Sequence, residues 1–160
     1  MLRTLIHYTI FFGLLACILL ALLGYVSRHQ SPIGLIEGQL MNCPERPVCV
    51  SSRQDKDHPS WVQPLKINGP ADAAWERIQS CVQEIGGTIH TVQDQYMWAT
   101  FRSAVFGFVD DLELSLHRDT RQIQVRSASR IGFYDFGQNR SRVNKLRTCF
   151  QNHQPQAEDG

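Results

Sequence analysis

Near its start the chain carries an apolar stretch, residues 5–26, that a water-soluble fold has no means of leaving exposed. Of its 22 residues, 20 are non-polar when Gly and Tyr are counted, and none is Asp, Glu, Lys or Arg. As a helix it would be about 33 Å long, close to the roughly 30 Å hydrocarbon core of a bilayer. Leu5 to Val26 is therefore predicted to be a membrane anchor, which excludes a purely soluble protein unless the segment is removed.

Two other interpretations of the apolar stretch stay open. A cleaved secretory signal usually has an apolar core of about 7–15 residues and a small-x-small cleavage site, and no good site follows Ala21. The run Leu14-Leu15-Ala16-Cys17 resembles a lipoprotein signal. Leu15 is bulky for that motif, however, and aliphatic residues follow Cys17 where a polar linker is expected. The anchor fits the length best.

Cysteine usage indicates the compartment, because the positive-inside rule is nearly balanced across this segment. Four cysteines lie outside it: Cys43, Cys49, Cys81 and Cys149. An even number in a small domain is typical of an oxidising compartment, although four unrelated thiols remain the alternative. Three pairings are possible, and we expect Cys43 with Cys49 first and Cys81 with Cys149 second. The sequence thus predicts a single-pass membrane protein with its C-terminal domain extracytoplasmic, most simply in a bacterial inner membrane and facing the periplasm.

The remainder of the chain divides by composition into three parts. Residues 27–60 are rich in Pro, Gly and Ser and read as a linker and irregular lead-in that holds Cys43 and Cys49. Residues 61–152 have the periodicities of an α+β domain, and residues 153–160 form a polar tail, of which Gln154–Gly160 is expected to be frayed.

Within residues 61–152 the pattern predicts a strand, a helix, four antiparallel strands and a closing helix. Apolar residues recur at helical spacing from Ala71 to Ile85 and again over residues 138–152. An edge strand is expected over residues 61–67 and a hairpin over residues 88–103. The predicted fold is an antiparallel sheet of four to five strands with two helices packed on one face.

The second hairpin can be placed in register from the sequence. A turn centred on Asp119-Thr120 makes the numbers of paired residues sum to 239, so that Leu114 faces Val125 on the core side. On the outer side Glu113 then faces Arg126, an opposite-charge pair.

The same register places polar residues on the core side. Asp110 lies opposite Ser129, with Ser127 two places along. The structural interpretation is a closed network in which both hydroxyls donate to the carboxylate. The functional interpretation is a cleft at the end of the sheet in which Asp110 binds or polarises a ligand.

A basic segment follows. Residues 118–147 contain eight Lys or Arg and two acids. Convergence of Arg126, Arg130 and Arg140, together with Arg142, beside a helix N-terminus would suit a phosphate, a carboxylate or an anionic lipid headgroup. The alternative is a solvated basic face with Arg126 paired to Glu113 and Arg130 to Asp111.

Other classes of chemistry find little support. The net charge is +1, and neither a phosphate-binding glycine motif nor interleaved aromatic residues occur, so nucleic acid is not expected as a partner. No metal-ligand spacing such as HExxH or CxxC occurs, and we expect no metal and no cofactor.

Three stretches together carry a resemblance to a known family. They are Cys43-Pro-Glu-Arg-Pro-Val-Cys49-Val-Ser-Ser52, then Val109-Asp-Asp-Leu-Glu113, then Val125-Arg-Ser-Ala-Ser-Arg-Ile-Gly132 with Asp135-Phe-Gly-Gln-Asn-Arg140 and Arg142-Val143. This pattern resembles the uncharacterised domain-of-unknown-function family numbered 1499, over about residues 43–150. Val48 departs from it, since the family commonly has asparagine there. The resemblance implies an envelope or organelle-lumen protein of unsettled activity.

The sequence therefore predicts a membrane-anchored extracytoplasmic binding or interaction module, more simply non-enzymatic, whose partner is an anionic ligand or an envelope protein. The candidate site residues are Arg126, Arg130, Arg140, Asp110, Ser127 and Ser129. The alternative is an enzyme acting on an anionic envelope or lipid substrate, with Asp110 as acid or base and the arginines as an anion clamp.

Overall fold

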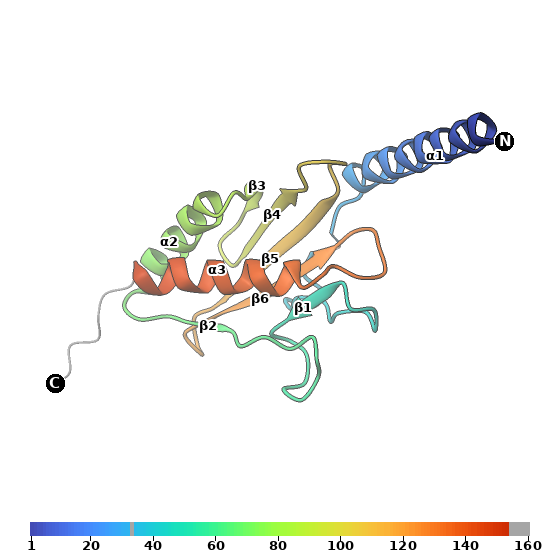
Figure 1. Ribbon diagram of the computed structural model, residues 1–160. Helices are drawn as coiled ribbons and strands as arrows, with labels where there is room; N and C mark the ends of the chain where they lie inside the picture. The colour runs from blue at the N-terminus through green and yellow to red at the C-terminus, as the bar shows by residue number, and fades with distance from the viewer. Residues whose placement is uncertain (33, 154–160) are drawn as a thin grey trace.

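A computed structural model describes residues 1–32 and 34–153 (Figure 1). The helices are α1 (Leu2–Arg28), α2 (Ala71–Glu84) and α3 (Gln138–Asn152). The strands are β1 (Cys49–Ser51), β2 (Leu65–Lys66), β3 (Thr88–Val92), β4 (Tyr96–Arg102), β5 (Val109–His117) and β6 (Gln122–Ser129). The predicted tail segment Gln154–Gly160 lies outside the described residues.

The strands form one antiparallel sheet in the order β1-β6-β5-β4-β3, and β2 also pairs with β6. Helices α2 and α3 pack on one face of this sheet (Figure 1). The predicted α+β class, with an N-terminal apolar helix and two helices on an antiparallel sheet, is confirmed. The sheet gains short strands at its edge because Cys49–Ser51, in the stretch expected to be irregular, pairs with β6.

The predicted register of the β5–β6 hairpin is confirmed. Leu114 pairs with Val125 and Glu113 with Arg126, as the alternation of apolar and polar residues requires. The apolar members of both strands are buried beneath the helices. They form one core with residues of α2 and α3 such as Ile78 and Leu146, neither of which is exposed.

A disulfide joins the two helices that cover the sheet. Cys81 of α2 and Cys149 of α3 are bonded, at a sequence separation of 68. Both cysteines also belong to the hydrophobic core. The bond therefore links the first helix of the domain to its last.

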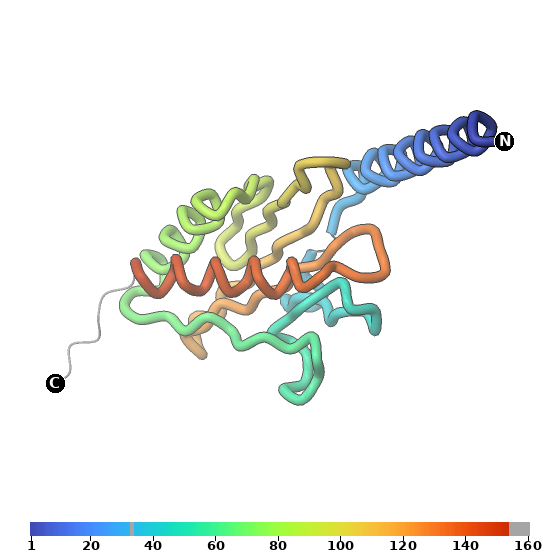
Figure 2. The backbone as a smooth tube through the Cα atoms, in the orientation of Figure 1, coloured from blue at the N-terminus to red at the C-terminus, as the bar shows by residue number. Residues whose placement is uncertain are grey.

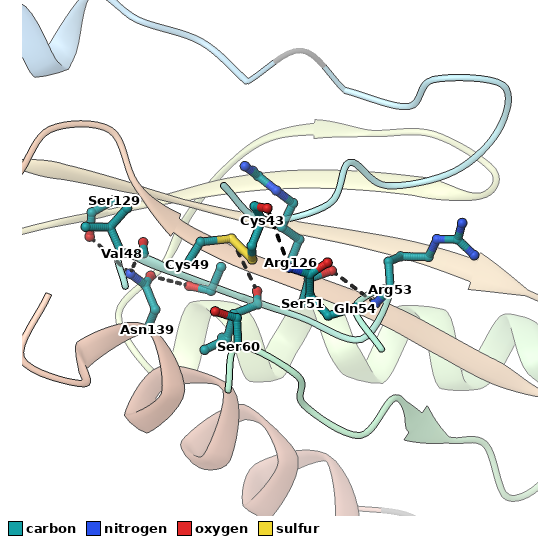
Figure 3. The surroundings of a disulfide bond; sticks show 12 residues. Cys43, Val48, Cys49, Ser51, Arg53, Gln54, Ser60, Arg126, Ser129 and Asn139 are labelled. Carbon is teal, nitrogen blue, oxygen red and sulfur yellow. Dashed lines mark hydrogen bonds between the residues drawn. A yellow bond between two sulfur atoms is a disulfide. The ribbon is translucent and has the colours of Figure 1, made fainter. Parts of the chain in front are cut away.

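The second disulfide joins the lead-in to the sheet. Cys43 is bonded to Cys49, the first residue of β1 (Figure 3). On one side of this bond the amide of Gln54 approaches the carbonyl oxygen of Cys43, at 3.5 Å. Both predicted pairings are thus present, which is consistent with an extracytoplasmic domain.

Two expectations about the sheet are wrong. The strand expected over residues 61–67 is regular only at Leu65–Lys66, because Pro64 has no N–H to donate to a neighbouring strand. The outer face of the β5–β6 hairpin was expected to face solvent, yet Glu113 there is only 2 % exposed. The lead-in approaches this face: Gly34 lies beside the hydroxyl of Tyr96, which donates to Glu113, and Met41 and Cys43 line a pocket together with Arg126.

The N-terminal helix α1 is attached to the domain at its C-terminal end only (Figure 2). It is long and apolar enough to cross a membrane, although a signal sequence has the same properties. Gly24 packs against the backbone of Phe106, between β4 and β5. Ser27 is fully buried, and its hydroxyl accepts a hydrogen bond of 2.7 Å from the backbone N–H of Val109. The last turn of α1 is therefore part of the folded domain.

Candidate functional site

The six candidate residues do not converge on one site. Because side chains alternate along a strand, Ser127 and Ser129 of β6 face the helices with Asp110, whereas Arg126 lies on the opposite face of the sheet. Arg130 follows β6 and also lies on that opposite face, against Asp111. The expected clamp of arginines around Asp110 is thus absent from the described structure.

Arg140 points away from both faces. It lies on α3, and its guanidinium donates to the carbonyl oxygens of Pro59 (2.5 Å) and Trp61 (3.0 Å). These bonds tie α3 to the segment that precedes β2. Arg140 therefore has a structural role in holding the lead-in against the helix.

The hydrogen-bond partner of Asp110 is Arg142, and not the two serines as expected. Its Nη2 lies 2.6 Å from Oδ2 of Asp110, and its guanidinium lies 4.5 Å from the centre of the Phe101 ring. Ser127 donates to Asn139 instead of Asp110, at 2.7 Å. The expectation that the serine hydroxyls satisfy this carboxylate is therefore wrong.

Asn139 is the hub of the polar network under α3. It is fully buried, and its Oδ1 accepts from Ser127 and from Arg142. Its Nδ2 lies within 3.0 Å of Val48 O and of Ser129 Oγ (Figure 3). A buried amide with this many partners fixes the start of α3 against β6 and β1.

Asp135 completes the network at the start of α3. Its carboxylate accepts from the backbone N–H of Gly137 at 2.9 Å and from that of Asn139 at 3.0 Å. Acidic groups stabilise helix N-termini in this way. The amide donors that the sequence suggested for an anion are thus partly occupied by Asp135.

A pocket that Asp110 and Arg142 line opens beside this network. It has a volume of about 270 Å³ and lies between the end of β4, the start of β5 and the first turns of α3. It is lined by Ile85, Phe101, Arg102, Ser103, Asp110, Gln138, Ser141, Arg142 and Lys145. We call it the Asp110 pocket.

The Asp110 pocket has more positive than negative charge. Its lining has three cations and one carboxylate, and only Arg142 is paired to that carboxylate. Within residues 1–32 and 34–153, neither Arg102 nor Lys145 has an acidic partner within 4 Å, and both are exposed. An anionic group entering the pocket would therefore meet cations that nothing else in the described chain neutralises.

The opposite face of the sheet holds a buried chain of polar groups. Tyr96 donates to Glu113 at 2.9 Å, and Arg126 lies 2.7 Å from the second oxygen of the same carboxylate. Burial raises the pKa of Glu113, and Arg126 opposes that shift. Burial and the nearby Glu113 carboxylate also raise the pKa of Tyr96, which keeps its hydroxyl protonated as a donor.

Arg130 is paired in the same layer. Its guanidinium makes two bonds to Asp111, at 2.7 and 2.8 Å, and the indole N–H of Trp98 donates to that carboxylate at 2.8 Å. The alternative of paired arginines, Arg126 with Glu113 and Arg130 with Asp111, is thus the arrangement observed. A pocket of about 380 Å³ lies over these groups, and its residual charge is small because each arginine faces its own acid.

One cluster has the side chains of a metal site. Ligand atoms of Cys81, Glu84, Cys149 and His153 lie within 4.8 Å of one another. The two sulfur atoms are bonded to each other, so the oxidised protein offers only one carboxylate and one imidazole. Zinc and similar ions prefer three or four protein ligands, and this set does not supply them while the disulfide is closed.

Three residues of the network, Asn139, Asp135 and Arg142, were not among the six candidate residues. Asn139 lies four residues before Val143, on the face of α3 that carries the apolar stripe. Because its side chain is polar, only the structure shows that it is buried. For the candidates Arg126 and Arg130, the sequence already indicated that they lie apart from the two serines. Side chains alternate along a strand, so these even-numbered residues face the opposite side of β6 from Ser127 and Ser129.

The fold and the Asp110 pocket define a small α+β domain with one apolar N-terminal helix and a cation-lined pocket where β4 ends and β5 begins. The chain belongs to the family of proteins of unknown function DUF1499, whose model matches residues 39–150. The predicted family is thereby confirmed over residues 39–150. No curated protein matches the chain.

Proposed function

We propose that this protein is a membrane-anchored binding module that takes a ligand bearing a phosphate or carboxylate group in the Asp110 pocket. The observation that carries the proposal is the pair of unneutralised cations, Arg102 and Lys145, beside Arg142 in a pocket of about 270 Å³. Charged hydrogen bonds from such groups are the usual means of holding phosphate and carboxylate. The ring of Phe101 would lie beside an apolar part of the ligand.

We place the domain outside the cytoplasm, in the cell envelope and most simply in the bacterial periplasm. Two disulfides within one small domain support an oxidising compartment. The contacts of Gly24 and Ser27 with the domain support retention of α1, because cleavage before Arg28 would remove groups that the folded domain uses.

An enzyme acting on an anionic envelope or lipid substrate is the second candidate. Its support is Asp110, which lines the pocket and, among the described residues, receives a hydrogen bond only at Oδ2. Its Oδ1 is therefore available to a ligand as an acceptor or base. The lining contains Ser103 and Ser141 but neither histidine nor cysteine, so the usual activators of a serine nucleophile are not beside it.

Calorimetric titration of the full chain in detergent tests the binding function. Inorganic phosphate and glycerol 3-phosphate serve as probes, compared with the uncharged glycerol. We expect Lys145→Ala and Arg102→Ala each to weaken binding about tenfold, which corresponds to about 1.4 kcal/mol. Lys56→Ala is the matched control, because Lys56 is an exposed cation outside the pocket. Equal affinity in all four proteins, or no binding of either phosphate, would contradict the proposal.

Location is tested separately. Alkaline carbonate should leave the full chain in the membrane fraction, and protease added to spheroplasts should digest the domain. Release by carbonate would show that α1 does not anchor the mature protein, and protection of the domain in intact spheroplasts would place it in the cytoplasm.

A further inference from the structure

We infer that two loops beside α1 insert into the lipid headgroup region, so that the domain rests against the bilayer. They are the β4–β5 loop (residues 103–108) and the β6–α3 loop (residues 130–137). This inference rests on the proposed function, because it requires that α1 spans a membrane. It adds a second lipid contact, made by the folded domain itself.

The exposed hydrophobic side chains of the domain gather in these loops. After α1, six large hydrophobic side chains are exposed in the part of the chain that the structure describes: Ile36, Val92, Val105, Phe133, Tyr134 and Phe136. The three most exposed, at 81–83 %, are Val105, Phe133 and Phe136. Apolar groups concentrated in this way on one part of a surface usually mark a binding surface.

Neither core packing nor backbone geometry explains why these exposed positions carry large apolar side chains. Phe136 has a φ of 53°, in the left-handed region that bulky residues seldom adopt. Its ring packs edge-on against that of Tyr134, which is itself exposed. Phe133 lies under the guanidinium of Arg46, an exposed cation of the lead-in. The aromatic residues of this loop therefore contribute little to the fold and are available to a partner.

The contact of α1 fixes the depth of the β4–β5 loop. A Cβ on Gly24 would lie only 2.0 Å from the carbonyl oxygen of Phe106, so the loop backbone touches the helix at that residue. Gly24 precedes Val26, the end of the apolar stretch, by two residues, or about 3 Å along the helix. When α1 spans the bilayer, Phe106 and Val105 must lie at the level of the headgroups.

The β6–α3 loop begins at the same level. Arg130, its first residue, donates to the carbonyl oxygen of Ser27 at 2.9 Å, one residue after Val26. In Figure 1 the loop extends beyond the sheet on the side from which α1 leaves the domain. Aromatic rings favour the headgroup level, and Arg46 beside Phe133 suits lipid phosphates. The bilayer is therefore the partner that these side chains fit best.

The test is the lipid exposure of single tryptophans introduced into the full chain. Phe133→Trp and Phe136→Trp are each reconstituted in phosphatidylcholine–phosphatidylglycerol vesicles, with or without lipids brominated on the acyl chain. Native Trp emission is subtracted using the wild-type chain in the same vesicles. Both replaced side chains are exposed, so the core is not disturbed. We expect brominated lipid to remove most of the added emission and aqueous iodide to remove little of it.

Asp119→Trp is the matched control. Asp119 is exposed in the β5–β6 turn, ten residues along the chain from Val109, the end of β5 that touches α1. Its added emission should be quenched by iodide and not by brominated lipid. If the loop tryptophans behave like this control while the protein resists carbonate extraction, α1 anchors the domain and loop insertion is wrong. If both quenchers fail at Phe133 and Phe136, a protein covers the loop, and the lipid inference is also overturned. Release by carbonate would instead overturn the proposed anchoring, and this inference with it.

Discussion

The guanidinium of Arg130 joins the buried carboxylate of Asp111 to the last turn of α1. Two of its nitrogens bond to Asp111, and a third donates to the backbone carbonyl oxygen of Ser27 at 2.9 Å. Carbonyl oxygens at a helix C-terminus lack partners within the helix and attract cations. Arg130, which the sequence suggested as part of an anion clamp, thus connects the apolar helix α1 to the sheet.

Replacing Arg130 with alanine should destabilise the domain. Both side chains of the pair are less than a tenth exposed, so the variant leaves the Asp111 carboxylate buried without its cation. Loss of one partner of a buried ion pair costs about 3–5 kcal/mol. Urea unfolding of the full chain in detergent measures the change. Arg118→Ala is the control, because Arg118 pairs with the exposed acids Asp72 and Asp94 and should have little effect. Similar losses in the two variants would show that burial of the Arg130 pair has no energetic consequence.

Gly24→Ala should loosen the attachment of α1. The added methyl group would meet the backbone oxygen of Phe106 at 2.0 Å, and a backbone atom can move aside only if the loop moves with it. Overpacking of this kind costs roughly 1–3 kcal/mol. Hydrogen exchange of the Val109 amide, which donates to Ser27, should become faster. Gly13→Ala places the same methyl group where nothing lies within 4 Å, and it should leave that exchange rate unchanged.

The sequence predicted the β5–β6 register and the span of α3 because both depend on periodicity. It did not predict that Glu113 is buried, because alternation assigns a residue to a face but says nothing about what covers that face. The lead-in approaches this face at Gly34, beside the Tyr96 hydroxyl, and its path depends on Cys43–Cys49 and on turns with no periodic signal. The same limit applies to the site. Alternation correctly placed Asp110 on the core side, but it could not identify its partner, because Arg142 belongs to a separate element, α3.

The two disulfides should differ in their contribution to stability. In the chain-entropy account a bond that closes a longer loop stabilises more, which gives about 4 kcal/mol for Cys81–Cys149 and about 2 kcal/mol for Cys43–Cys49. Paired alanine replacements at each bond, compared by thermal unfolding, test this order. A larger loss for the Cys43–Cys49 pair would show that it is needed mainly to hold the lead-in over the outer face.

Glu113 should make stability depend on pH in a defined direction. Burial raises its pKa above the ordinary value of 4.5 despite the neighbouring Arg126. The folded protein then binds this proton more tightly than the unfolded chain does. Its contribution is therefore fully present below the unfolded pKa and is lost as pH rises through the folded pKa.

The Glu113→Gln variant isolates this contribution, because the other titrating groups are common to both proteins. The free energy of unfolding of the wild type minus that of Glu113→Gln should decrease as pH rises from about 4 to about 7, by about 1.4 kcal/mol for each unit of pKa shift. A difference that increases over this range would mean that Arg126 outweighs burial and lowers the pKa of the carboxyl.

Asp110→Asn separates the two candidate functions, because only an enzyme needs this carboxylate for turnover. For a binding module the variant removes the one carboxylate of the pocket and leaves Arg142 free to contact an anion. Phosphate should then bind more tightly, by about tenfold or about 1.4 kcal/mol. Arg142 keeps its bonds to Ser127 and Asn139, so the network under α3 should remain in place. For an enzyme that uses Asp110 as acid or base, the variant would instead lose turnover of a phosphate-ester substrate whatever its affinity. Phosphate affinity that is unchanged or weaker in Asp110→Asn would show that the carboxylate does not oppose anion binding, and the pocket would then be rejected as the anion site.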